Sequence, residues 1–106
     1  MRVLLDSCVP KGLGASLTGH DVQTAPEMGW GDLDNGALLE AMDGLFDALV
    51  TVDRRLPHQQ RIRDRSFGVV VLRATSNRLA DLLPLVPELL AAVSELNAGT
   101  ATEVGM

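Results

Sequence analysis

The chain has little with which to build a disulfide framework, an aromatic binding platform or a membrane span. Cys8 is its only cysteine, which excludes a disulfide scaffold and a multi-cysteine zinc site. There is no tyrosine, and one tryptophan with two phenylalanines is too few for the stacking surfaces of single-strand binders. The apolar stretch from Leu82 to Val93 is interrupted by Pro84, Pro87 and Glu88, and it is shorter than a transmembrane helix. We therefore expect a cytoplasmic protein with no membrane partner.

Basic residues are also scarce, with nine Lys and Arg against fourteen Asp and Glu and a net charge of -5. This balance argues against a general nucleic-acid coat. The average hides a division, because residues 1–53 carry nine acids and two bases, whereas residues 54–106 carry five acids and seven bases. Five arginines lie between positions 54 and 65, directly after Asp53. Guanidinium groups beside carboxylates suit phosphate binding, and an ordinary solvated surface is the other interpretation.

Short apolar runs alternate with segments of helical character along the whole chain. With 106 residues, of which 46% are hydrophobic, the chain is expected to form a single domain, 1–106. We expect strands at 2–5, 21–24, 46–52 and 67–72, and helices at 10–17, 34–42 and from 76 to about 96. Residues 54–65 favour a helix broken near Pro57. Pro84 or Pro87 breaks or restarts the last helical region, and the tail 98–106 is either a short edge strand or frayed. The alternation predicts an α/β fold built on a parallel sheet.

Two aspartates follow buried-looking strands, and they carry the main functional hypothesis. Asp6 follows the run Arg2 to Leu5, and Asp53 follows the run Ala48 to Val52. Parallel strands bring their last residues to one edge of the sheet, where ligands bind. Carboxylates that meet there repel each other, and a divalent cation such as Mg²⁺ relieves the repulsion. Because a bound metal can polarise a phosphodiester and activate water, the pattern favours a metal-dependent nuclease.

Several short motifs follow one another in a characteristic order. They are Val3-Leu4-Leu5-Asp6, Gly19-His20-Asp21-Val22, Glu27-Met28-Gly29-Trp30, Asn35-Gly36-Ala37-Leu38-Leu39 and Leu49-Val50-Thr51-Val52-Asp53. Their order and spacing resemble those of the short PIN-like domain family, often described as VapC-like toxin components of bacterial toxin–antitoxin pairs. The resemblance extends from Met1 to about Leu72. It implies a PIN-like three-layer α/β/α sandwich with a mostly parallel central sheet of four or five strands.

The resemblance also implies an activity and a site. It implies an Mg²⁺- or Mn²⁺-dependent endoribonuclease that hydrolyses RNA phosphodiester bonds and leaves a 5′-phosphate and a 3′-hydroxyl. Asp6, Asp53 and Asp34 are then the catalytic and metal-binding residues. The residues expected to contact substrate phosphate are Arg54, Arg55, Asn35, Gln59 and Gln60. The implied partners are an RNA substrate, an antitoxin protein and a second copy of the chain, the last two held by the leucines between positions 79 and 96.

The chain departs from the family pattern at two positions, and this keeps a second hypothesis open. Cys8 and Arg55 stand where short PIN-like relatives often carry further acids. A degenerate, non-catalytic PIN-like module that binds a partner protein or RNA is therefore the alternative. Each aspartate also has a structural interpretation, because Asp6, Asp53 and Asp34 are all suited to capping the segment that follows them.

Overall fold

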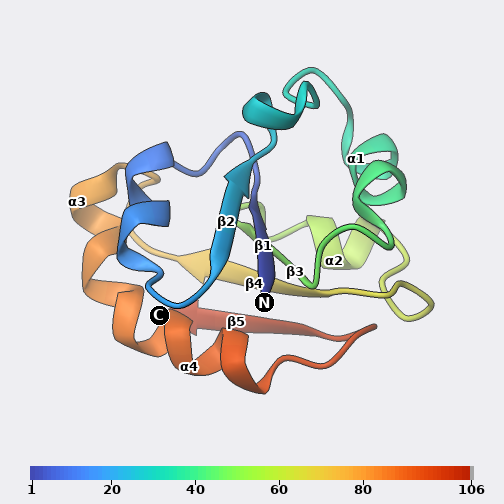
Figure 1. The fold of residues 1–106 in the computed structure, drawn as a ribbon. Helices are drawn as coiled ribbons and strands as arrows, with labels where there is room; N and C mark the ends of the chain where they lie inside the picture. The colour runs from blue at the N-terminus through green and yellow to red at the C-terminus, as the bar shows by residue number, and fades with distance from the viewer. Residues whose placement is uncertain (106) are drawn as a thin grey trace.

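Five parallel strands form the centre of the computed structural model, which describes residues 1–105 (Figure 1). Their order across the sheet is β2-β1-β3-β4-β5, and every neighbouring pair is parallel. The strands are β1 (Arg2–Leu5), β2 (Asp21–Thr24), β3 (Ala48–Thr51), β4 (Gly68–Arg73) and β5 (Ala101–Gly105). The helices are η1 (Lys11–Ser16), η2 (Pro26–Met28), α1 (Asn35–Met42), α2 (Leu56–Gln59), α3 (Leu79–Leu82), η3 (Leu83–Leu85) and α4 (Val86–Glu95), of which η1, η2 and η3 are 3₁₀ helices.

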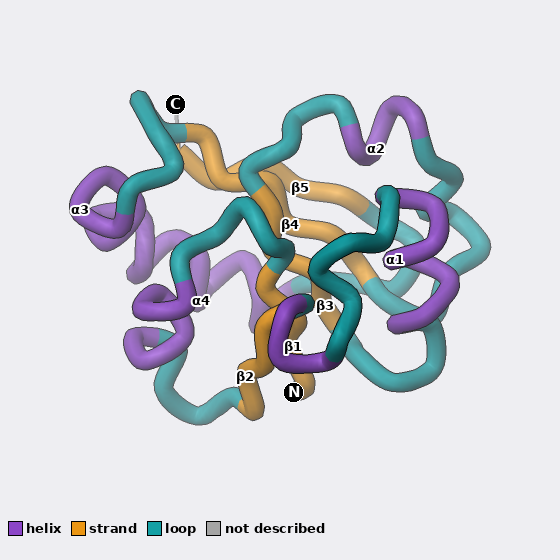
Figure 2. The backbone as a smooth tube through the Cα atoms, turned by 90° about the horizontal axis from the view of Figure 1, so that it is seen from above, coloured by secondary structure: helices purple, strands orange, loops and turns teal. Residues whose placement is uncertain are grey.

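Helices cover both faces of the sheet. Figure 2 shows α3 and α4 on one side of the strands and α1 and α2 on the other. The first face packs strand residues such as Leu5 and Val50 against Leu89 and Val93 of α4. The second face forms a separate cluster in which strand residues pack against α1 and α2 (Leu4, Leu49, Leu38, Leu39, Met42 and Leu56). Strands buried on both faces read as continuous apolar runs, which is why β3 and β4 lack a polar–apolar alternation.

The structure confirms the expected α/β class with a parallel sheet, and the strands lie where the apolar runs indicate. The segment after β1 begins one residue after Pro10 and is a 3₁₀ helix. Between 54 and 65 only Leu56–Gln59 is helical, so a longer helix broken near Pro57 is wrong; that proline lies in the first turn, where its missing N–H costs no hydrogen bond. The tail 98–106 contains the edge strand β5, and Met106 lies outside the described residues.

The leucine-rich region from 76 to 96 is a run of three short helices. Pro84 lies in the first turn of η3, and Pro87 lies in the first turn of α4. Each proline therefore begins a new helix, because its fixed φ suits a first turn and a helix interior would lose a backbone hydrogen bond. No helix within residues 1–105 is both long and apolar enough to cross a membrane.

The strand order creates a topological switch point beside β1. The chain leaves β1 to form β2 on one side, and it later returns to form β3 on the other side of β1. The carboxyl ends of β1 and β3 therefore flank a topological switch point, where open parallel sheets bind their ligands. The Asp6 N–H donates to the Val50 carbonyl at 2.9 Å, so the pairing of these two strands continues to the residue where each turns away.

Candidate functional site

Asp6 and Asp53 come to the same edge of the sheet and are connected through one threonine. Thr51, the last residue of β3, is fully buried, and its hydroxyl donates to Asp6 Oδ2 at 2.8 Å. The same Thr51 Oγ1 accepts the backbone N–H of Asp53 at 3.1 Å. A threonine hydroxyl that accepts the N–H two residues further on forms a local turn, and this turn holds the backbone of Asp53 at the end of β3. The two aspartates that the sequence singled out therefore belong to one hydrogen-bonded unit.

Asp6 is a buried carboxylate without a cationic partner in the described part of the chain. It is 7% exposed, and its Oδ1 accepts the N–H of Ser7 at 2.8 Å. Within residues 1–105, neither Asp6 nor Asp53 forms an ion pair with a basic side chain. Burial of a carboxylate is costly unless it is paired, hydrogen-bonded or bound to a metal. Hydrogen bonds alone offset the cost here, which leaves an electrostatic environment that favours a cation.

Helix α1 positions the amide that completes this unit. Asn35, the first residue of α1, donates from Nδ2 to Asp53 Oδ2 at 3.1 Å. Asp53 Oδ1 accepts the Arg55 N–H at 2.9 Å, so both carboxylate oxygens of Asp53 are held. The Asn35 side-chain carbonyl is the acceptor end of the same amide, and an amide oxygen is a suitable ligand for a hard cation.

Asp34 caps α1, as its structural interpretation expects. Its Oδ1 accepts the Ala37 N–H at 2.8 Å, which satisfies one of the free donors at the helix start. Within residues 1–105, no group of three or more His, Cys, Asp or Glu side chains is arranged to hold a metal ion. The metal role of Asp34 therefore stays a prediction, and the structure shows it as a neighbour of the unit through Asn35.

Cys8 lies beside Thr51 at the same edge of the sheet. Its Sγ lies 3.5 Å from Thr51 Oγ1. Burial raises the pKa of the Cys8 thiol, and the nearby Asp6 carboxylate acts in the same direction. The thiol is therefore neutral at neutral pH and adds no negative charge beside Asp6.

The other predicted phosphate contacts are spread over several elements. Arg55 lies just before α2 and Gln59 lies on it, and both are exposed. The backbone N–H of Arg55 donates to the Asp53 carboxylate. Gln60 reaches the first turn of α1, since a Cβ on Gly36 would lie 3.4 Å from Gln60 Oε1. Of the residues expected to contact phosphate, Arg54, Arg55 and Asn35 lie closest to the carboxylates along the chain or through hydrogen bonds.

The remainder of the arginine cluster leaves the carboxyl edge of the sheet. Arg65 pairs with Glu40 at 2.9 Å and with Asp43 at 3.2 Å. Arg61 pairs with Asp64 at 2.9 Å. For Arg61 and Arg65 the structural interpretation holds, because their charges are balanced by Asp64 and by Glu40 and Asp43, away from the candidate site.

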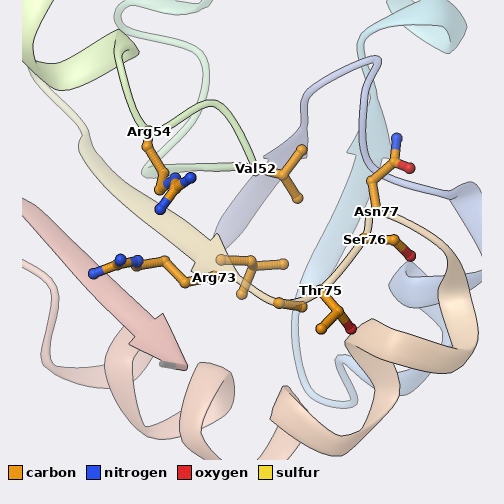
Figure 3. Close-up of a pocket in the computed structure, with 8 residues that line it drawn as sticks. Val52, Arg54, Arg73, Thr75, Ser76 and Asn77 are labelled. Atoms are coloured by element: carbon orange, nitrogen blue, oxygen red, sulfur yellow. The ribbon is translucent and has the colours of Figure 1, made fainter.

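An open pocket of about 360 Å³ lies at the carboxyl ends of β3 and β4 (Figure 3). Arg54 and Arg73 line it from one side, and the loop after β4 supplies polar side chains from the other. That loop is tied to the segment after β1, because Asn77 Nδ2 donates to the Cys8 carbonyl at 3.0 Å. The pocket is thus lined by the residues on either side of Asp53, and its loop is bonded to the segment that follows Asp6.

Two participants in this arrangement were not predicted. The sequence predicts Thr51 only as part of a strand. Its position two residues before Asp53 is the signal that could have identified it as a hydrogen-bond partner of the site. Arg73 lies at the end of β4, far along the chain from the arginine cluster, and only the adjacency of β3 and β4 reveals it. Comparisons with protein-family models, with curated proteins and with solved structures found no match.

Proposed function

We propose that this protein is a metal-dependent ribonuclease of PIN-like type, acting as the toxin of a toxin–antitoxin pair. The observation that carries the proposal is the Asp6–Thr51–Asp53 unit. In it the buried Asp6 carboxylate, which has no cationic partner within residues 1–105, is linked through the Thr51 hydroxyl to the backbone N–H of Asp53 at the switch point of a parallel sheet. The all-parallel sheet with helices on both faces is compatible with the PIN-like sandwich that the motif order implies.

The donor atoms at this edge fit Mg²⁺ or Mn²⁺. Asp6 and Asp53 supply carboxylate oxygens, Asn35 supplies an amide oxygen, and oxygen ligands are the ones that these hard cations prefer. When bound, such an ion would polarise a phosphodiester and lower the pKa of a coordinated water. With two carboxylates the site suits a single cation that keeps several waters, and a two-metal site lacks its further acids.

The other residues of the edge have separate roles in this proposal. Thr51 orients the Asp6 carboxylate, and the Asn35 amide orients that of Asp53. Arg54 follows Asp53 directly in the chain, and its guanidinium would bind the phosphate of the substrate. Arg55, Gln59 and Gln60 flank this edge and would contact the RNA strand further from the scissile bond.

The alternative function, a non-catalytic PIN-like module, is favoured by one specific observation. No third acid joins Asp6 and Asp53 within residues 1–105, and the positions where acids are expected hold the neutral Cys8 and the cationic Arg55. Such a module would bind RNA or a partner protein at this edge and leave the strand intact.

A cleavage assay with matched variants separates the two functions. Purified protein is incubated with structured and single-stranded RNA in Mg²⁺, in Mn²⁺ and in a chelator. We expect metal-dependent cleavage that Asp6→Asn and Asp53→Asn each reduce by at least about a hundredfold, the scale of losing a group that stabilises developing charge. Asp21→Asn is the control, because Asp21 is an exposed acid at the opposite end of the sheet. Intact RNA in every metal, together with RNA binding, would favour the non-catalytic module.

The partner proposals need a separate test. Most of the large side chains of the leucine-rich segment pack in or against the core. Leu82, Leu89 and Val93 are fully buried, whereas Leu83 is 42% exposed. An antitoxin or a second copy of this chain would therefore contact only the outward positions. Size-exclusion chromatography with light scattering, alone and with the product of a neighbouring reading frame, distinguishes a monomer, a homodimer and a heteromeric complex.

A further inference from the structure

The pocket between β3, β4 and the loop after β4 has the residues to bind an anionic ligand. Its cationic wall consists of Arg54 and Arg73, and its polar wall consists of Thr75, Ser76 and Asn77 (Figure 3). It opens at the carboxyl edge of the sheet, and the chain that carries Arg54 is the chain that carries Asp53. A ligand in this pocket therefore contacts Val52 and Arg54, the two residues that flank Asp53 in the chain.

Arg73 is held in the resting protein by one weak contact. Its Nη1 lies 3.1 Å from Glu103 Oε2, and the two side chains are 37% and 55% exposed. Exposed ion pairs of this kind contribute little to stability. The Arg73 Nε is buried and has no hydrogen-bond partner within residues 1–105. Because a buried donor without an acceptor is costly, the guanidinium gains when it turns towards an anion that satisfies more of its N–H groups.

The rest of the pocket suits a phosphate better than a carboxylate or an apolar ligand. Within residues 1–105, Arg54 forms no ion pair, so its positive charge is not neutralised by a neighbour. Thr75 is exposed and lies on the other side of the pocket from the arginines. Two guanidinium groups in one pocket match the several acceptor oxygens and the negative charge of a phosphate.

The loop that carries Thr75 has a fixed position. Asn77 is bonded to the Cys8 carbonyl, and Ser76 Oγ accepts the Arg78 N–H at 3.0 Å. A preorganised loop loses little conformational freedom when a ligand binds. The polar wall therefore needs no rearrangement when a ligand binds, whereas the Arg73 side chain has to turn away from Glu103.

We propose that this pocket binds a backbone phosphate of a single-stranded RNA, with Arg73 as its principal ligand and Thr75 opposite it, so that a neighbouring phosphodiester lies at the Asp6–Thr51–Asp53 unit. This inference rests on the proposed function, because that function identifies the strand as RNA. Glu103 acts as an internal competitor, since it pairs with Arg73 when the pocket holds no phosphate.

The test measures binding without cleavage, so that its failure and the failure of the nuclease proposal are distinguishable. A short fluorescein-labelled single-stranded RNA is titrated with the full chain in a chelator, and anisotropy is followed at several salt concentrations. Arg73→Gln should weaken binding by at least about tenfold, the value of losing one hydrogen bond to a charged group. It should also lower the slope of log K against log salt by about 0.7, which corresponds to one phosphate contact on a single strand.

Matched variants separate a specific pocket from overall charge. Glu103→Gln removes the competitor and should tighten binding severalfold, whereas Glu95→Gln makes the same change of charge at the end of α4 and should have little effect. The double variant Arg73→Gln with Glu103→Gln has the net charge of the wild type, and it should bind as weakly as Arg73→Gln alone. Arg61→Gln is the matched loss of an arginine outside the pocket, and it should change the affinity less than about twofold.

Three results would overturn the inference. They are an absence of RNA binding in the chelator, an equal loss of affinity for Arg73→Gln and Arg61→Gln, and a double variant restored to the affinity of the wild type. Uridine monophosphate that binds as tightly as the oligonucleotide would also contradict it, because the pocket would then accept free phosphate compounds in place of a strand. Arg73-dependent binding without cleavage in any metal would support the pocket and contradict the nuclease.

Discussion

At the scale of single residues, Thr51 determines how the two aspartates relate to each other. It is a polar side chain that is fully buried in the last position of β3, and it bonds to both aspartates. A buried hydroxyl that orients a buried carboxylate is costly to remove, because the carboxylate then lacks a donor. The sequence predicted that Asp6 and Asp53 share an edge. It did not predict the connection, since a threonine in a strand is ordinary on composition.

We expect Thr51→Val to lower the free energy of unfolding by about 1.5–3 kcal/mol, the range for a hydrogen bond to a charged group. Valine keeps the shape and the β-branching, so the change isolates the hydroxyl. Chemical denaturation monitored by circular dichroism measures the loss. Thr102→Val is the control, because Thr102 is exposed on β5, and its effect should stay within about 0.5 kcal/mol. Equal effects of the two substitutions would show that the Thr51–Asp6 bond is unimportant.

At the scale of elements, the strands were predictable and the helices only in part. Continuous apolar runs mark buried parallel strands, and this signal is local to the sequence. The local sequence does not decide where the short helices begin and end, because prolines at 57, 84 and 87 fit a helix start as well as a helix break. Strand β5 is mostly exposed and pairs only with β4, so its sequence carries a weak strand signal. Arg73 escaped prediction for the related reason that its neighbours come from distant parts of the chain.

Gly68 marks a close approach between β4 and the chain that follows α4. A Cβ at this first residue of β4 would lie 2.5 Å from Leu96 Cγ and 2.7 Å from the Asn97 carbonyl oxygen. We expect Gly68→Ala to lower the free energy of unfolding by about 1–3 kcal/mol, because the chain after α4 must shift. Thermal and chemical denaturation measure this loss.

A glycine with space around it provides the control for Gly68. At Gly31 the nearest atom to an added Cβ is Pro26 Cα at 3.5 Å, an ordinary contact. Gly31→Ala should therefore leave stability within about 0.5 kcal/mol of the wild type. A Gly68→Ala protein as stable as Gly31→Ala would contradict the close packing of β4 against the end of α4.

At the scale of the whole molecule, the two ends of the sheet differ in how their charged groups are paired. At the amino ends of the strands, acids are paired or hydrogen-bonded, as in the bond between Asp47 Oδ2 and the Arg2 N–H at 2.8 Å. At the carboxyl ends, Asp6 and Asp53 have no cationic partner within residues 1–105, and Arg54 forms no ion pair there. Charges that a fold leaves unpaired at a ligand-binding edge are a sign of function more than of stability.

The structural acids predict a defined dependence of stability on pH. Hydrogen bonds from the Ser66 side chain and backbone and from Arg65 lower the pKa of Asp43 below 3.8. A carboxyl whose pKa is lowered on folding stabilises the protein above its unfolded pKa, and this contribution is lost as the pH falls through the folded value. Asp43→Asn should therefore be less stable than the wild type at pH 6, and the difference should shrink below about pH 4.

Urea denaturation at a series of pH values measures this difference for Asp43. Asp32→Asn serves as the control, because Asp32 lies on an exposed loop before α1. A difference between Asp43→Asn and wild type that stays constant from pH 6 to pH 3 would contradict the lowered pKa.

Calorimetric titration with Mg²⁺ and Mn²⁺ tests directly whether Asp6 and Asp53 form one cation site. Wild type, Asp6→Asn, Asp53→Asn and the control Asp21→Asn are compared, with circular dichroism to confirm that each is folded. We predict saturable binding of a single cation to the wild type and to Asp21→Asn, and its loss in Asp6→Asn and in Asp53→Asn. Wild-type protein that binds no metal up to millimolar concentration, or binding that survives either substitution at the edge, would contradict the account.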